Sequence, residues 1–124
     1  MINLIAVDDE KDVRVLFEHF FQHEIVNGDV NLIFESSGQG CLEKLTSLEG
    51  NIIVLSDINM PEMSGIELLK IISQDFPDAK VILVSAYDQS RYQEELQQYG
   101  AVGYISKPVD FIALKSKVFE IFSV

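Results

Sequence analysis

The chain has 124 residues, of which 48% are hydrophobic and 23% are charged. That length suits one domain with its own core, and that composition excludes a disordered acidic segment. The net charge of −11 disfavours direct binding to nucleic acid or to an anionic membrane. The single cysteine excludes an internal disulfide, and no apolar run is long enough to span a membrane. We therefore expect one cytoplasmic domain over residues 1–124.

The negative charge is concentrated in the first half of the chain. Residues 1–62 contain 12 acidic and 3 basic residues, a net charge of −9. Residues 63–124 contain 8 acidic and 6 basic residues, a net charge of −2. This asymmetry suggests that carboxylates have a function in the first half.

Five short apolar segments alternate with five helical patterns. The predicted strands cover residues 4–7, 31–34, 52–55, 81–84 and 102–105, and most are continuously apolar, which is typical of parallel strands covered on both faces. Apolar residues recur with the helical period over 13–21, 41–48, 66–72 and 114–122, and the more polar segment 89–99 predicts the least firmly packed helix. Ser64 and Glu67 have the spacing of a capping box at the start of the third helix. The alternation predicts an α/β fold of five strand–helix units, (βα)5, with helices on both faces of a parallel sheet.

Polar residues stand where the predicted strands end. Asp8 and Asp9 follow the first strand, Asp57 the third, Ser85 the fourth and Lys107 the fifth. Such folds bind ligands at the carboxyl ends of their strands. Taken alone, the Asp8-Asp9 pair favours a helix cap over a metal site. Three carboxylates that converge repel one another unless a cation lies among them, and oxygen ligands of this kind favour Mg²⁺, with Mn²⁺ as a substitute.

The same edge of the sheet holds the groups needed to transfer a phosphoryl group to a carboxylate. Asp57 is the candidate nucleophile, and a bound metal together with the Lys107 ammonium would neutralise the phosphoryl charge. The Ser85 hydroxyl stands where it could contact the same phosphoryl oxygens. The pattern therefore indicates phosphoryl-transfer chemistry.

Four motifs in this order resemble the receiver domain of two-component response regulators, and the likeness covers essentially the whole chain. They are Val7-Asp8-Asp9-Glu10, Asp57-Ile58-Asn59-Met60-Pro61 followed by Gly65, Ser85-Ala86, and Lys107-Pro108. The resemblance implies a doubly wound, flavodoxin-like sheet of five parallel strands in the order 2-1-3-4-5. It also implies a phosphorylation-dependent signalling switch and not a conventional enzyme. Its expected phosphodonor is a sensor histidine kinase or a phosphotransfer protein.

The resemblance assigns the acidic positions. Asp57 resembles the phosphoacceptor, and Asp8 and Asp9 resemble the pair that holds Mg²⁺ with Asp57. The backbone carbonyl of Asn59 is implied as a further metal ligand. Gly65 is interpreted as a position that needs a tight turn or a close backbone approach.

The resemblance also assigns the switch positions. Ser85 and Tyr104 match the hydroxyl and the aromatic ring that move together on phosphorylation. Lys107 resembles the phosphate-binding lysine, and its peptide bond to Pro108 is implied to be cis. The likeness places the surface for a downstream protein target on the fourth helix, fifth strand and fifth helix, where residues 89–124 hold four acidic and four basic residues.

Other interpretations share part of the pattern. A Mg²⁺-dependent aspartyl phosphohydrolase would normally carry its nucleophile at the first strand with a second acid two residues on, whereas Asp8 and Asp9 are adjacent. A flavodoxin that binds FMN needs a hydroxyl-rich phosphate loop at that same place. A degenerate receiver that only docks is disfavoured because the key positions are all intact. The sequence fits equally a stand-alone regulator and a receiver domain excised from a larger multidomain regulator or hybrid kinase.

Overall fold

Five parallel strands form one sheet in the order β2-β1-β3-β4-β5 in the computed structural model, which describes residues 1–123. The strands are β1 (Ile2–Val7), β2 (Val30–Glu35), β3 (Asn51–Asp57), β4 (Lys80–Ser85) and β5 (Gly103–Ser106). Val7 lies opposite Glu35 of β2 and Ser56 of β3, so the carboxyl ends of the three strands meet at one edge. The predicted fold class and strand order are confirmed.

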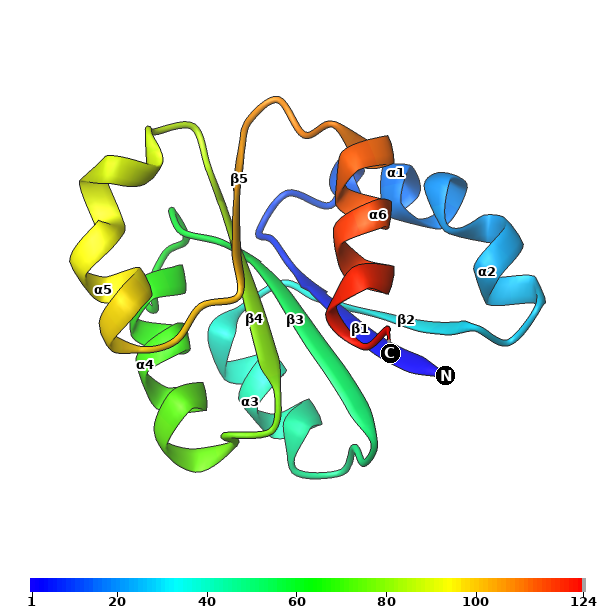
Figure 1. Cartoon of the computed structure of the whole chain (residues 1–124), viewed down its shortest axis with the longest axis horizontal. Coiled ribbons are helices and arrows are strands. Elements are labelled where there is room, and N and C mark those ends of the chain that lie inside the picture. Colours follow the sequence, from blue (N-terminus) through cyan, green and yellow to red (C-terminus); the bar gives the residue numbers. More distant parts are fainter. Residues whose placement is uncertain (124) are drawn as a thin grey trace.

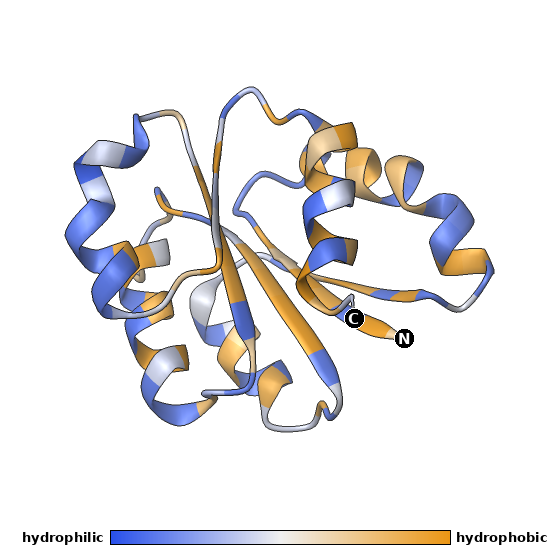
Figure 2. Cartoon of the chain, in the orientation of Figure 1, coloured by the Kyte–Doolittle hydropathy of each residue, from blue (hydrophilic) through white to orange (hydrophobic). Residues whose placement is uncertain are grey.

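Helices cover both faces of the sheet (Figure 1). One face carries α1 (Asp12–Phe20), α2 (Gln22–Val26) and α6 (Phe111–Ile121). The other face carries α3 (Gly38–Leu45), α4 (Gly65–Asp75) and α5 (Gln93–Gln98), which follows the 3₁₀ turn η1 (Gln89–Tyr92). The strands are hydrophobic along most of their length, whereas α5 is mainly hydrophilic (Figure 2).

The sheet separates two hydrophobic cores. Alternate residues of one strand point to opposite faces, so Ile5 packs with α3 and α4, while Leu4 packs with α1 and α6. All six residues of β1 are buried, which explains why this strand is continuously apolar and not alternating. None of the helices in the part of the chain that the structure describes is long and apolar enough to cross a membrane.

The predicted helix over residues 13–21 matches α1, but the structure adds a short helix, α2, that was not predicted. The chain turns at Phe21, whose side chain is fully buried, and α2 follows directly. The apolar period continues past the surface that the core can cover, so Leu16 and Phe20 stay exposed beside the buried Phe17. Segment 89–99 also differs from one continuous helix, because it begins as a 3₁₀ turn and buries only Leu96.

Two other local features lie in α3 and at the start of α4. Ser64 and Glu67 form the predicted capping box, in which Ser64 Oγ accepts a hydrogen bond from the Glu67 amide at 3.1 Å. Cys41 of α3 is fully buried in the core. Burial raises the pKa of its thiol to about 12, and the nearby Glu35 charge acts in the same direction.

Candidate functional site

Three carboxylates converge at the carboxyl ends of β1 and β3. Asp8 and Asp9 directly follow β1, and Asp57 is the last residue of β3. One ligand oxygen from each of the three lies within 4.8 Å of the others. Asp8 and Asp57 are buried, whereas Asp9 is exposed. Within residues 1–123 this is the only group of three or more potential metal-ligating side chains of the His, Cys, Asp or Glu type.

Hydrogen bonds hold the two buried carboxylates of this triad in place. Asp8 Oδ1 accepts from the Glu10 amide at 2.9 Å, and the Asp8 amide donates to the Glu35 carbonyl at the end of β2. Asp57 Oδ1 accepts from the amide of Asn59 at 3.2 Å. The backbone therefore fixes the carboxylates in position before any ligand arrives.

Lys107 supplies the positive charge at this site. Its Nζ lies 2.8 Å from Asp57 Oδ2, and among the described residues it is the only basic side chain in ion-pair contact with the triad. Burial alone would lower the pKa of Lys107, but its hydrogen bond to Asp57 and the charges of Asp57, Asp8 and Glu10 raise it above the ordinary value. The peptide bond from Lys107 to Pro108 is cis.

The charge balance of the triad remains negative despite Lys107. Burial raises the pKa of the Asp8 carboxyl, and the charge of Asp57 raises it further, against the Glu10 hydrogen bond and the Lys107 charge. Asp8 is thus costly to keep ionised in the folded protein. A divalent cation would remove that cost, and three carboxylate oxygens form a donor set that hard divalent cations accept.

Gly65 lets the backbone approach Asp57 closely. A Cβ atom at this position would overlap the Asp57 carbonyl oxygen and lie 2.8 Å from Ile58 Cα. The Gly65 amide donates to the Ile58 carbonyl at 2.9 Å, and the Ile58 amide donates to Val84 of β4. The structure confirms the close approach expected at this glycine, and the contact holds the end of β3 against the start of α4.

Ser85 and Tyr104 are connected through the loop after β4. Ser85 is fully buried, and its Oγ accepts from the Tyr87 amide at 3.1 Å. The Tyr104 hydroxyl donates to the carbonyl of the same Tyr87. The Arg91 guanidinium lies 4.0 Å from the centre of the Tyr87 ring. Sequence analysis did not foresee Tyr87 as the residue that joins the two positions, because the link uses its backbone.

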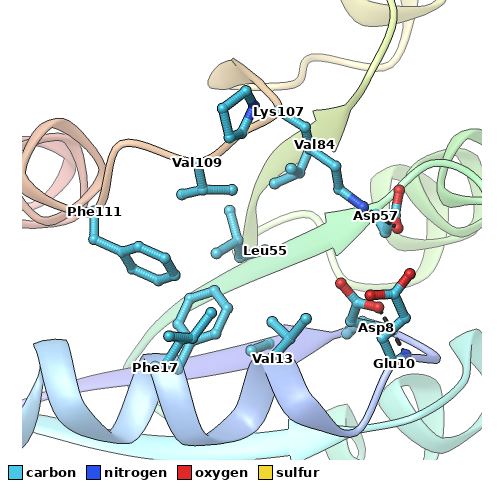
Figure 3. A pocket seen from close by; sticks show the side chains of 14 residues that line it. Asp8, Glu10, Val13, Phe17, Leu55, Asp57, Val84, Lys107, Val109 and Phe111 are labelled. Atoms are coloured by element: carbon cyan, nitrogen blue, oxygen red, sulfur yellow. Dashed lines mark hydrogen bonds and ion pairs between the residues drawn. The ribbon is translucent and has the colours of Figure 1, made fainter.

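An apolar cavity of about 290 Å³ opens beside the triad (Figure 3). Asp8, Glu10, Asp57 and Lys107 line one end. The remaining wall is mainly hydrophobic and includes Val13, Phe17, Leu55, Val84, Val109 and Phe111. This apolar wall explains the desolvation of Asp8. The cavity was not predicted, since it depends on how α1 packs against the segment that leads into α6.

The chain matches the family model described as response regulator receiver domain over residues 4–119. It is 32% identical over 109 residues to the chemotaxis protein CheY of Listeria monocytogenes, with 87% of each chain covered. The crystal structure of the response regulator protein TrrA from Thermotoga maritima, solved in complex with Mg²⁺–BeF, has a TM-score of 0.80 and 33% identity to it, covering 98% of this chain and 100% of TrrA.

Some relatives are much longer than this chain. The DNA-binding transcriptional regulator NtrC of Proteus hauseri is 34% identical over 108 residues, which cover 87% of this chain but 22% of NtrC. The match over residues 4–119, the five-stranded sheet and the acidic triad agree with one another. The chain belongs to the response regulator receiver domain family.

Proposed function

We propose that this chain works as a phosphorylation-dependent signalling switch in which Asp57 accepts the phosphoryl group. The observation that carries the proposal is the convergence of the three carboxylates within 4.8 Å, with Lys107 Nζ 2.8 Å from Asp57. Membership of the receiver family supports a sensor histidine kinase or a phosphotransfer protein as the donor.

In the transfer step, an Asp57 carboxylate oxygen attacks the phosphorus of the donor's phosphohistidine. The new oxygen–phosphorus bond forms as the phosphorus–nitrogen bond breaks, and the electron pair stays on the donor imidazole, which takes a proton from solvent. The Lys107 ammonium releases its Asp57 oxygen and pairs with the phosphoryl oxygens. The Asp57 carboxylate is already oriented for this step, because its Oδ1 accepts the Asn59 amide.

The donor set of this site fits Mg²⁺, with Mn²⁺ as a substitute. Asp8, Asp9, Asp57 and the backbone carbonyl of Asn59 would hold the cation. When bound, it neutralises charge on the carboxylates and on the transferring phosphoryl group. The fit is supported by the three oxygen donors within 4.8 Å, by the buried charge of Asp8, and by the Mg²⁺–BeF complex of TrrA.

Phosphorylation of Asp57 would change the conformation of the protein through Ser85 and Tyr104. A phosphoryl group on Asp57 adds charge and acceptor oxygens, which attract the Ser85 hydroxyl away from the Tyr87 amide. Because Tyr87 also accepts the Tyr104 hydroxyl, movement of this loop changes the position of the Tyr104 ring. We propose that the downstream protein target binds the surface formed by η1, α5, β5 and α6, with no direct role for nucleic acid.

The same switch would serve a free receiver domain or one within a longer regulator of the NtrC kind. We take residues 1–124 as a single receiver domain. We propose a cytoplasmic location, where a sensor histidine kinase or a phosphotransfer protein would meet the chain.

The test is phosphorylation by a small donor. Incubation with Mg²⁺ and acetyl phosphate should add the mass of one phosphoryl group to the chain and to an Asp75→Asn control, but not to Asp57→Asn. No mass gain in the parent chain, or an equal gain in Asp57→Asn, would refute the proposal. Sustained release of phosphate from simple phosphate esters would instead favour the aspartyl phosphohydrolase.

A further inference from the structure

Exposed apolar side chains gather on α1 and α2. Val15 is 68% exposed, Val26 is 79% exposed and Ile25 is 36% exposed. They border a groove of about 590 Å³ whose other wall is formed by Leu32 and Phe34 of β2. We call this surface, with Val15, Ile25, Val26, Leu32 and Phe34 as its apolar residues, the β2 groove. Side chains that are this apolar and this exposed together mark a contact surface.

The groove lies beside an open edge of the sheet. β2 is the outermost strand on its side and pairs only with β1 within the part of the chain that the structure describes (Figure 1). The carbonyls of Asp29 and Glu35 accept bonds from β1, so the alternate residues Val30, Leu32 and Phe34 direct their N–H and C=O groups to the free edge.

This edge lacks the usual protection against pairing. β2 has six residues, Val30–Glu35, and contains neither lysine nor proline. The opposite edge strand, β5, has four residues and is followed by Lys107 and Pro108. The longer and less protected edge is therefore the one that adjoins the β2 groove.

The charge of the β2 groove favours a second copy of the chain as the partner. Its polar lining includes one basic and one acidic residue, Arg14 and Glu18, in a chain whose net charge is −11. Two copies of so acidic a chain repel one another over most of their surface, but here they meet at a neutral patch. Arg14 and Glu18 lie one turn apart on α1, with Nε and Oε1 2.8 Å apart. In a dimer, Arg14 of one copy can therefore pair with Glu18 of the second copy instead.

We propose that the β2 groove is a homodimer surface, in which β2 of one copy pairs antiparallel with β2 of a second copy. The two-fold axis of such a pair is perpendicular to the sheet, so it keeps the α1 and α2 helices of both copies on the same face. There the exposed Val15 and Val26 side chains of the two copies are buried against each other. The interface does not use Asp57 and does not depend on its phosphorylation.

The experiment measures self-association of the whole chain by analytical ultracentrifugation from about 1 µM to about 1 mM, the range of weak association. We expect the average mass to rise toward that of a dimer. Val15→Glu and Val26→Glu should each weaken the dimer by about tenfold or more, because the two-fold axis brings each new charge near its own copy. Ile112→Glu is the matched control, since Ile112 is 76% exposed on α6.

A second measurement tests the strand pairing itself. In hydrogen exchange, the amides of Leu32 and Phe34 should become protected as concentration rises, and the protection should be lost in Val15→Glu. A chain that stays monomeric up to the highest concentration would overturn the proposal. An equal effect of Ile112→Glu and Val15→Glu would also overturn it, as would concentration-independent protection of these two amides.

Discussion

Lys107 reaches across the end of β4 to place its Nζ 2.8 Å from Asp57 Oδ2, fifty residues away in the chain. The Lys107 amide is fixed to the Ser85 carbonyl at 2.8 Å, so the ion pair joins the ends of β3, β4 and β5. Asp57 is almost completely buried, whereas a third of the Lys107 side chain is exposed. The ammonium can therefore leave Asp57 for a ligand at the surface, while the carboxylate stays where it is.

Replacing Lys107 should weaken both the fold and the chemistry. Lys107→Met keeps the apolar stem but leaves the triad without its ion pair, so in chelator the melting temperature should fall by about 2–5 °C. Phosphorylation of Asp57 by acetyl phosphate should slow by at least about tenfold. Differential scanning calorimetry and intact-mass kinetics measure the two effects. Lys70→Met, on the exposed side of α4, should change neither, and a similar loss in that control would contradict the prediction.

Asp8→Asn should stabilise the metal-free protein. The asparagine keeps an oxygen acceptor for the Glu10 amide but removes the buried charge that repels Asp57. In chelator at neutral pH its melting temperature should rise by about 2–5 °C, and Mg²⁺ should no longer raise it as much as in the parent. Asp57→Asn should gain less, because it also loses the pair with Lys107. A lower melting temperature for Asp8→Asn in chelator would contradict this account.

The stabilisation by Asp8→Asn should depend on pH. Because the folded pKa of Asp8 is raised, the ionised carboxylate destabilises the fold above that pKa, and protonation relieves the strain as the pH falls through it. The difference in melting temperature between Asp8→Asn and the parent should therefore shrink as the pH is lowered. Thermal melts in chelator over a series of acidic buffers measure this. A difference in melting temperature that grows as the pH is lowered would contradict this prediction.

Gly65→Ala should displace the end of β3. The added methyl group would overlap the Asp57 carbonyl oxygen, which is backbone and cannot move aside cheaply. We expect a loss of at least about 2 kcal/mol in the free energy of unfolding, measured by urea denaturation, and slower phosphorylation of Asp57. Gly40→Ala is the control, because its Cβ would meet only side-chain atoms, the flexible end of Glu35 and, at 3.3 Å, the Ser37 hydroxyl. Equal free energies of unfolding for Gly65→Ala and Gly40→Ala would show that the close approach at Gly65 does not cause the loss of stability.

Ser85→Ala should separate phosphorylation from the switch. The variant keeps the triad and Lys107, so acetyl phosphate should still modify Asp57. The Tyr87 amide loses its acceptor, and the phosphoryl group has no hydroxyl to attract. In ¹⁵N NMR spectra, phosphorylation should then shift the amides of β5 and α5 much less than in the parent. Ser56→Ala is the control, because the buried Ser56 hydroxyl donates to the Asp57 carbonyl and this variant should keep the full response. Loss of the amide shifts in Ser56→Ala as well would show that the shifts respond to any disturbance near Asp57 and not to the Ser85 hydroxyl.

The location of the site could be predicted from the sequence because it is defined by where strands end. The apolar runs stop at Val7 and Leu55, and the acidic residues follow at once or after a single serine. A parallel sheet brings such ends to one edge whatever the helices do. The acidic triad at that edge follows from this rule alone.

Features that depend on helix packing could not be predicted in the same way. Phe111 stacks on Phe20 with ring centres 4.6 Å apart and meets Phe17 edge-on at 5.2 Å, contacts between segments about ninety residues apart. These contacts position α1 against α6 and so shape the cavity beside Asp8. The helical period of α1 carries no signal for them. It equally gives no sign of α2, the short helix that follows Phe21.

The buried thiol of Cys41 can be used to measure unfolding of the domain. It is the only cysteine, it lies in the core between the sheet and α3, and its pKa of about 12 keeps it protonated at neutral pH. Alkylating reagents act on the thiolate, so the native chain should resist them and the unfolded chain should react. The rate at which Cys41 is alkylated would then report how often the domain unfolds. Mg²⁺ should slow this rate if the cation binds the folded triad.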